Sequence, residues 1–174
     1  MYEWSTRRVS DAGQEGKGMN YYEPADIVIY IEGKGVVLKE KSLMALDETS
    51  GKILAFGNEA ERMAKNPGDS VKIVSPLRRG MVAEYGATVK LFLYFLHKAG
   101  ERKLFRKPAI AVSAPEGMTE VERKALEESL FQAGAGKVYI SEMTVEELAQ
   151  KLGQGNEKAL KNFHTILGIV PDKV

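Results

Sequence analysis

The sequence has 174 residues, of which 44% are hydrophobic and 28% are charged, an ordinary balance for a globular protein with a sizeable core. Its net charge of +1 provides no overall field that would attract nucleic acid. There is no cysteine and there are two histidines, His97 and His164, so we exclude disulfides and thiolate chemistry and expect no metal site. No apolar run approaches the about 20 residues of a membrane span. We expect a cytoplasmic protein.

The first 20 residues are polar and contain glycine, with Trp4 as the one large apolar anchor. This composition predicts a flexible tail over residues 1–22, ahead of a single domain over 23–174. Trp4 beside Arg7 and Arg8 would also suit a membrane interface, but the stretch is too polar for an amphipathic anchor. We favour the tail.

From Ala25 onward the pattern predicts β-structure. The runs DIVIYI and VVLKEKSLMAL, joined by EGKG, are typical of two strands with a glycine turn, which explains these glycines without a phosphate site. ILAF at 53–56 predicts a third strand, and GNEA at 57–60 opens a short helix that Asn66-Pro67-Gly68 ends. Val71–Val74 predicts one more strand.

The middle of the sequence predicts a buried helix followed by a buried strand. Residues 86–99 (GATVKLFLYFLHKA) are apolar around most of a helical circumference, which indicates a helix between two layers. The run AIAVSAP at 109–115 is typical of a central parallel strand. Thr119 and Glu122 fit a capping box at the start of the next helix, which glycines at 134–136 end.

The last third predicts one strand and two helices. KVYIS at 137–141 is the strand, and Thr144 with Glu147 fits a second capping box. We expect a final helix over 156–167, because three apolar residues recur there at helical spacing: Leu160, Phe163 and Leu167. Strands followed by β-α-β units indicate an α/β class with a mixed sheet.

Three stretches resemble the MreB/Mbl family of bacterial actin-like rod-shape proteins in both order and spacing. They are IVIYIEGKGVVLKEKSLMAL (27–46), GNEAERMAKNPGDSVKIVSPLRRGMVAEY (57–85) and VSAPEGMTEVERKALEESLFQAGAGKVYISE (112–142). The first is similar to the family's hairpin LIYVKGKGIVLNEPSVVAI, and the third to its VERRAI segment. The resemblance implies an actin-like (ribonuclease H-like) domain I, in which helices pack on a mixed sheet, with a small IB-like insertion at about 47–75.

The resemblance does not extend to the residues that bind the nucleotide in the family. The family binds ATP between two domains, and its first phosphate loop, D-L-G-T-A-N-T, directly precedes the first hairpin strand. Aligned on Tyr30, this chain has Glu23 at the glycine position, followed by Pro24. A carboxylate at ~4 Å from phosphate costs roughly 4 kcal/mol at an effective dielectric of ~20, and proline lacks a backbone donor. We therefore expect no cofactor.

The family's second phosphate loop belongs to its second domain. After Glu142 this chain diverges into a stretch, at about 143–174, that we expect to be helical, and we expect the second ATPase domain to be absent. The helix over 156–167 would then cover the sheet face on which the family's last helix lies. Together these departures predict that the chain is not an enzyme.

Three residues match or suggest site positions. Glu122 matches the glutamate of the family's V-E-R-R motif, which positions the attacking water, but with no phosphate loop we favour its role as a helix cap. Glu84 matches an aspartate beside the family's cleft and is equally well explained as a solvated loop carboxylate. His97 is expected at a helix end, where it favours the helix dipole, and not as a ligand or base.

Basic residues concentrate in residues 62–107, which hold eleven lysines and arginines against three acidic residues. Such a run usually marks a solvated face. Part of it could instead contact an anionic membrane, at about 1 kcal/mol per basic residue, or an acidic partner. Nucleic acid is not expected, because aromatic residues are not interleaved with the basic ones. This candidate surface is Lys98, Arg102, Lys103, Arg106 and Lys107.

We therefore expect a non-catalytic MreB-like protein of cell shape and the cytoskeleton, acting as an interaction or filament-modulating module. Its partner would be a full-length bacterial actin, or itself in a dimer. One alternative is half of a split actin-like ATPase whose partner chain supplies domain II. Another is an adaptor module at the inner face of the membrane.

Overall fold

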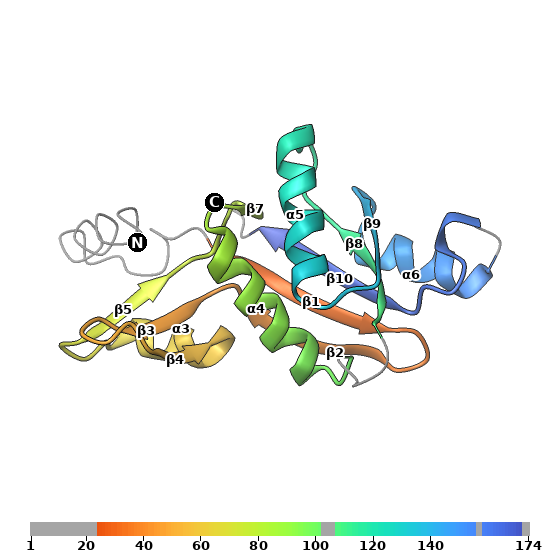
Figure 1. Ribbon diagram of the computed structural model, residues 1–174. Coiled ribbons are helices and arrows are strands. Elements are labelled where there is room, and N and C mark those ends of the chain that lie inside the picture. The colour runs from red at the N-terminus through yellow and green to blue at the C-terminus, as the bar shows by residue number, and fades with distance from the viewer. Residues whose placement is uncertain (1–23, 102–106, 156–157, 172–174) are drawn as a thin grey trace.

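The structure, a computed structural model, describes residues 24–101, 107–155 and 158–171. In these residues the chain forms a five-stranded, a three-stranded and a two-stranded sheet, together with four α-helices (Figure 1). The expected tail over 1–22 lies outside the described residues. So do Arg102, Lys103 and Arg106 of the candidate basic surface.

The five-stranded sheet has the order β2-β1-β10-β8-β9. β1 pairs antiparallel with β2 and with β10, whereas β10, β8 and β9 run parallel to one another. The mixed sheet expected from the sequence is therefore confirmed. The strands are β1 (Ala25–Ile31), β2 (Gly35–Lys41), β8 (Ala109–Ser113), β9 (Lys137–Ser141) and β10 (Thr165–Pro171).

The middle strand of this sheet corrects the expected final helix. The expectation of a helix over 156–167 is wrong, because the segment contains a short 3-10 turn, η1 (Lys158–Leu160), and then β10. Side chains of β10 alternate between the two faces: Leu167 packs with the α4 and α5 side, and Ile166 with the α6 side. A strand buried on both faces shows continuous apolar character, and Leu167 on β10 happened to stand at a helical spacing from Leu160 and Phe163, which precede the strand.

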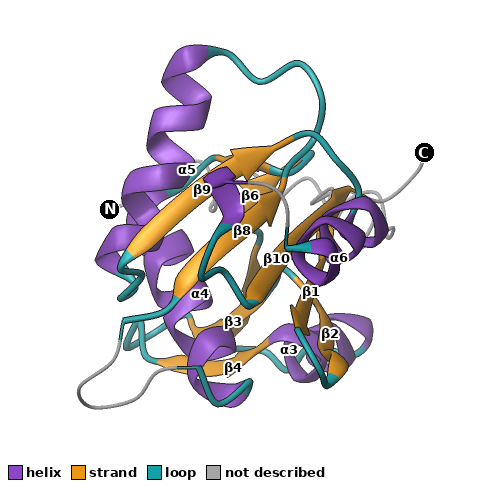
Figure 2. Ribbon diagram, turned by 90° about the vertical axis from the view of Figure 1, so that its right-hand side faces the viewer, coloured by secondary structure: helices purple, strands orange, loops and turns teal. Residues whose placement is uncertain are grey.

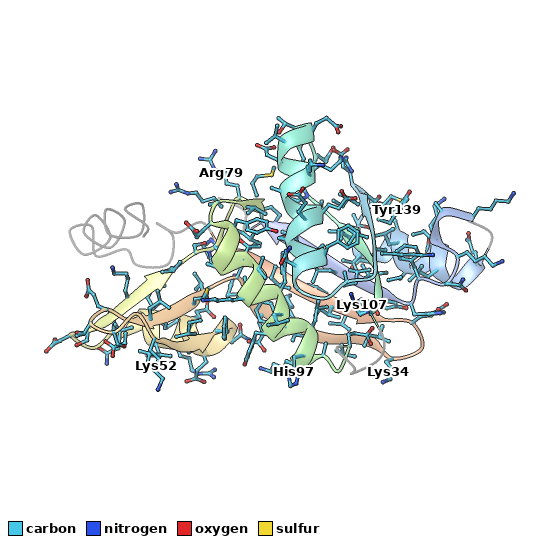
Figure 3. All side chains as sticks on the ribbon, viewed as in Figure 1. Lys34, Lys52, Arg79, His97, Lys107 and Tyr139 are labelled. Carbon is cyan, nitrogen blue, oxygen red and sulfur yellow. The ribbon has the colours of Figure 1, made fainter. Side chains whose placement is uncertain are left out.

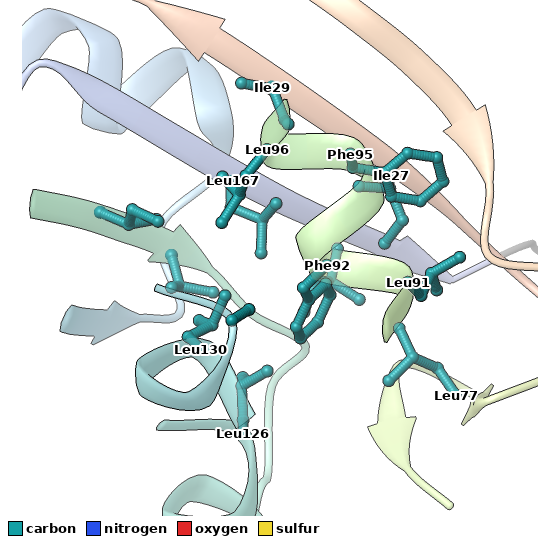
Figure 4. Packing of buried hydrophobic residues seen from close by; sticks show 14 of the residues in the cluster. Ile27, Ile29, Leu77, Leu91, Phe92, Phe95, Leu96, Leu126, Leu130 and Leu167 are labelled. Carbon is teal, nitrogen blue, oxygen red and sulfur yellow. The ribbon is translucent and has the colours of Figure 1, made fainter. Parts of the chain in front are cut away.

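Two helices cover one face of the sheet, and one helix and η1 cover the other (Figure 2). α4 (Tyr85–Lys98) and α5 (Glu120–Gln132), both expected as helices from the sequence, are on the first face, and α6 (Val145–Gln154) is on the second. Figure 4 shows the core under α4 and α5. Its fully buried side chains include Ile27, Ile29, Leu91, Phe92, Phe95, Leu96, Leu126 and Leu130.

A second, smaller unit extends from the edge of the main sheet. It contains β3 (Met44–Asp47), β4 (Ile53–Phe56) and β5 (Val71–Val74), with α3 (Gly57–Lys65), and it overlaps the segment 47–75 expected as an insertion. The run VVLKEKSLMAL is not one strand, because the chain leaves the main sheet after Lys41 and enters the small one at Met44. The unit has its own core, formed by Leu43, Ala45, Ala55, Ala60 and Ile73. A two-stranded ribbon, β6 (Leu77–Arg78) and β7 (Met81–Val82), leads from this unit toward α4.

The buried carboxylate of Glu40 joins the small unit to the main sheet. Its Oε1 accepts a hydrogen bond of 3.0 Å from the backbone N–H of Asn58, at the start of α3, and its Oε2 pairs with Nζ of Lys98 on α4. Gly57 has a φ of +66°, and a Cβ there would overlap Oε1 of Glu40. This is the physical reason why the GNEA turn begins with glycine.

Candidate functional site

A pocket of about 730 Å³ lies where β8 and β10 end and β1 begins. In sheets with parallel strands, ligands bind in crevices outside the carboxyl ends of these strands, which makes this pocket the candidate ligand site. It is lined by Asp26, Val28, Val36, Lys39, Ser113, Ala114, Pro115, Glu116, Glu142, Thr144, Val145, Glu146, Ile169, Val170 and Pro171.

The loops that follow β8 and β9 hold each other at the rim of this pocket. The hydroxyl of Ser113 donates to the carbonyl of Met143 at 2.7 Å, and the N–H of Met143 donates to the hydroxyl of Ser141 at 2.9 Å. Oε2 of Glu142 accepts from the N–H of Gly117 at 2.9 Å. These bonds fix the two loops against one another and place Glu116 and Glu142 on the same rim.

The pocket is acidic. It is lined by four carboxylates, those of Asp26, Glu116, Glu142 and Glu146, against the single cation of Lys39. Only Asp26 has a charged partner among the described residues, the ammonium of Lys41 at 3.0 Å. The local field therefore opposes an anionic ligand.

The described backbone around the pocket also lacks the glycines of a phosphate-binding loop. Its described lining contains Pro115 and Pro171 and no glycine, whereas phosphate loops rely on glycine for close approach and on backbone N–H donors. No group of three or more His, Asp or Glu side chains among the described residues could hold a metal ion together. The arrangement suits a cationic or apolar group better than a phosphate.

One wall of the pocket is an apolar strip of the main sheet that α6 leaves uncovered. Val36 on β2 is 58% exposed and Val170 on β10 is 45% exposed, and Val28 on β1 lies between their strands. Strips of this kind mark surfaces that another molecule can cover.

The candidate residues matched to the family lie outside this pocket. Oε2 of Glu122 accepts from the N–H of Thr119 at 2.9 Å, while the N–H of Glu122 donates to the Thr119 hydroxyl at 3.1 Å, so the expected capping box is present. Glu84 stands at the N-cap of α4, where its carbonyl accepts from Thr88. His97 is an exposed residue in the last turn of α4.

The two described members of the candidate basic surface have different surroundings. The hydrogen bond that Lys98 donates to the carboxylate of Glu40 raises the pKa of its ammonium, which is half exposed and also lies 5.8 Å from the ring centre of Tyr94. Lys107 instead lines a separate pocket at the amino ends of β8 and β9, together with Lys137 and His164. Lys98 is thus already engaged by a carboxylate, whereas Lys107 forms no ion pair with any residue that the structure describes.

Sequence reasoning missed Glu40 and β10. Glu40 follows Leu38 by two residues on β2, and both side chains face the core. A carboxylate at an inward strand position requires a partner. The two-residue spacing from Leu38 was therefore the sequence signal that could have identified Glu40 as buried and paired. For β10, the signal was the apolar run TILGIV ending at Pro171, the same pattern that marked β8.

Comparison with known proteins assigns the chain to a protein family. A family model described as MreB/Mbl protein matches residues 23–163. The chain belongs to the MreB/Mbl family. It is 36% identical over 133 residues to the cell shape-determining protein Mbl of Bacillus subtilis, covering 76% of this chain and 39% of that protein. With the cell shape-determining protein MreB of Pasteurella multocida it is 35% identical over 134 residues, covering 74% of this chain and 37% of that protein.

Solved structures show the same fold. MreB5 of Spiroplasma citri bound to ADP superposes with a TM-score of 0.58 at 31% identity, covering 67% of this chain and 35% of that one. The MamK double helical filament gives a TM-score of 0.51 at 13% identity, covering 66% of this chain and 40% of that chain, which is a likeness of fold alone. The actin-like fold expected from the sequence is confirmed. The chain spans less than two fifths of the curated relatives named above.

β10 lies outside the segment that the family model matches. The match ends at residue 163, and the strand begins at Thr165. The strand that joins the β1–β2 hairpin to the β8–β9 pair is thus contributed by sequence outside that match. Within the described residues, no helix has both the length and the apolarity that crossing a membrane requires.

Proposed function

We propose that this MreB/Mbl family member is a non-catalytic module of the cell-shape cytoskeleton, which binds a full-length bacterial actin in the cytoplasm and alters its filaments. Membership of the MreB/Mbl family supports a role in cell shape and the cytoskeleton. The observation that carries the non-catalytic part is the chemistry of the pocket at the ends of β8 and β10, with its four carboxylates, one lysine and no glycine in the described lining.

ATP would present three phosphates to that rim. Each carboxylate that lies near a phosphate at ~4 Å would oppose it by roughly 4 kcal/mol at an effective dielectric of ~20. Magnesium could offset part of this repulsion, but the described residues hold no group of three or more ligating side chains. Glu122, the one match to a family catalytic residue, is engaged in the capping box with Thr119.

The test has two parts. In isothermal titration with ATP and magnesium, the chain alone is expected to release no heat of specific binding, while a full-length relative serves as the positive control. In sedimentation of that relative's filaments, substoichiometric chain is expected to change the pelleted fraction. Specific ATP binding by the lone chain would end the non-catalytic proposal, and unchanged filaments at equimolar chain would end the filament proposal.

The apolar strip of Val36, Val170 and the half-buried Val28 favours one second candidate, half of a split ATPase. A partner chain that supplies the second domain would cover this strip and complete a cleft. In that case ATP would bind only when both chains are mixed, and Val36→Asp would weaken their association. If ATP binds to neither chain nor to the mixture, the split-ATPase candidate is excluded.

A further inference from the structure

The outer edge of β9 forms a groove that the functions discussed above do not use. β9 is the last strand of the five-stranded sheet, so in the described part of the chain one side of its backbone has no neighbouring strand. A pocket of about 550 Å³ follows this edge, between the end of α5 on one face and η1 on the other. It is lined by Phe131, Gly136, Lys137, Val138, Tyr139, Lys158, Ala159, Lys161, Asn162 and Phe163.

The opposite edge of the sheet is partly closed, which makes β9 the more accessible one. On β2, Oδ1 of Asn58 accepts from the N–H of Lys41 at 3.1 Å, and its Nδ2 donates to the carbonyl of Lys39 at 3.3 Å. One side-chain amide therefore occupies backbone groups that a further strand would use. On β9 the carbonyl of Ile140, near the carboxyl end, accepts from Nη1 of Arg123 at 3.3 Å. No hydrogen bond from a described side chain occupies the backbone of Lys137, Val138 or Tyr139, along which the pocket lies.

The groove carries an unbalanced positive charge. Lys137, Lys158 and Lys161 are exposed, and in the described residues none of them forms an ion pair or a side-chain hydrogen bond. An adjoining pocket of about 480 Å³ shares Lys137 and adds Lys107. Four lysines thus surround the amino-terminal half of the β9 edge. Among the described residues, Glu101 lines the adjoining pocket, whereas no carboxylate lines the pocket along the edge itself.

Aromatic side chains provide apolar contact in the same groove. Phe131, at the end of α5, is 44% exposed. Tyr139 on β9 packs edge-to-face on Phe163, with ring centres 6.3 Å apart. An open strand edge between two apolar walls is the geometry in which proteins bind an extended peptide, with backbone hydrogen bonds for affinity and side-chain pockets for specificity.

We propose that the β9 groove binds an acidic segment of a partner protein in extended conformation, as an added sixth strand. The edge supplies backbone donors and acceptors, Phe131 and Tyr139 receive apolar side chains, and the lysines select carboxylates. A membrane would use the lysines but not the backbone edge, because the edge needs a partner with N–H and C=O groups.

The direct test is fluorescence anisotropy with a labelled peptide of alternating glutamate and valine. The full chain is expected to bind this peptide more weakly as salt rises. Replacing every second valine by proline removes backbone donors and should abolish binding, and replacing glutamate by lysine should do the same. Equal binding of the proline peptide or of the lysine peptide would overturn the proposal.

Matched variants locate the site. Charge reversal in the groove is expected to weaken binding by at least about tenfold, since it replaces attraction by repulsion. An equal reversal elsewhere should change it by less than about twofold. The groove variant changes Lys137, Lys158 and Lys161 to glutamate, and its control changes Lys52, Lys65 and Lys90. Lys52 lies at the other end of the molecule from Tyr139 (Figure 3). Equal losses in the two variants would contradict the assignment.

A spectroscopic measurement and a lipid measurement complete the test. Amide chemical-shift changes on peptide addition should be largest in β9 and smaller in β2; the reverse order would refute the site. Vesicles of anionic phospholipid serve as the competing probe. If they bind the chain through the same lysines while the peptide does not bind, the groove faces a lipid surface and the peptide proposal fails.

Discussion

Gly168, in the middle of β10, is the position at which a single added methyl group tests the packing of α6 on the sheet. A Cβ there would lie 2.5 Å from Cγ2 of Val145 on α6 and 3.4 Å from Cβ of Val28 on β1. Overpacking of this kind costs about 1–3 kcal/mol, and the gain from a stiffer unfolded chain offsets roughly 0.4–1 kcal/mol. We expect Gly168→Ala to lower the free energy of unfolding by about 1–2 kcal/mol.

The assay is urea unfolding of a double-mutant cycle. Val145→Ala alone removes two methyl groups from a half-buried site and should cost about 1 kcal/mol. Because it also removes the clashing atom, the double variant should be more stable than additivity predicts, by about 1 kcal/mol. Strict additivity, or an unchanged stability of Gly168→Ala, would refute the view that α6 and β10 are in close contact at this point.

Three further outcomes follow from the contacts of Glu40 and Thr119. Glu40→Ala should cost about 2–4 kcal/mol in urea unfolding, because the N–H of Asn58 loses its acceptor and Lys98 its partner. Lys98→Met leaves the buried carboxylate of Glu40 with the Asn58 N–H, and it should cost less, about 1–2 kcal/mol. The reverse ranking would contradict the assignment of Glu40 as the central group. The folded-state pKa of Lys98 is raised, so the stabilisation by its ammonium is complete below the unfolded pKa of about 10.5 and is lost as pH rises through the folded pKa. The difference in free energy of unfolding between wild type and Lys98→Met should therefore shrink only at strongly alkaline pH. A difference that already shrinks near neutrality would contradict the role of the charged Lys98. Thr119→Ala should cost about 1 kcal/mol by opening the capping box with Glu122, measured by the same unfolding assay, and a change below a few tenths would show that the box contributes little.

Much of the fold could be predicted because local patterns agree with tertiary packing. The hairpin was marked by two strand-like runs around a glycine turn, α4 by apolar residues on most of its surface, and α5 by the Thr119 capping box, which the structure contains. β10 was missed although its apolar run resembles that of β8, because the Leu160, Phe163 and Leu167 spacing also fits a helix and a strand buried on both faces lacks the alternation that would decide between them. In the structure the first two residues pack on one face and Leu167 on the other.

The candidate site was harder to predict than the fold. The family resemblance directed attention to Glu122 and Glu84, but the pocket is lined by other carboxylates, including Glu116 and Glu146. These lie in loops or in the first turn of a helix, where a carboxylate is common without any function, so single-sequence patterns do not distinguish them. Lys98 was expected at a free basic surface, yet it reaches back to Glu40 from a distant part of the sequence.

The position of β10 in chain order has a consequence for synthesis on the ribosome. The β1–β2 hairpin and the β8–β9 pair meet only through β10, which follows all four strands in the sequence. As the chain emerges, these two halves can form separately but have no common neighbour, and their inner edges stay available to other chains. Closing the β1–β10 pair brings together residues near opposite ends of the described chain, and such non-local pairing slows folding. We therefore expect growing chains of this protein to expose these inner edges until residue 171 has left the exit tunnel.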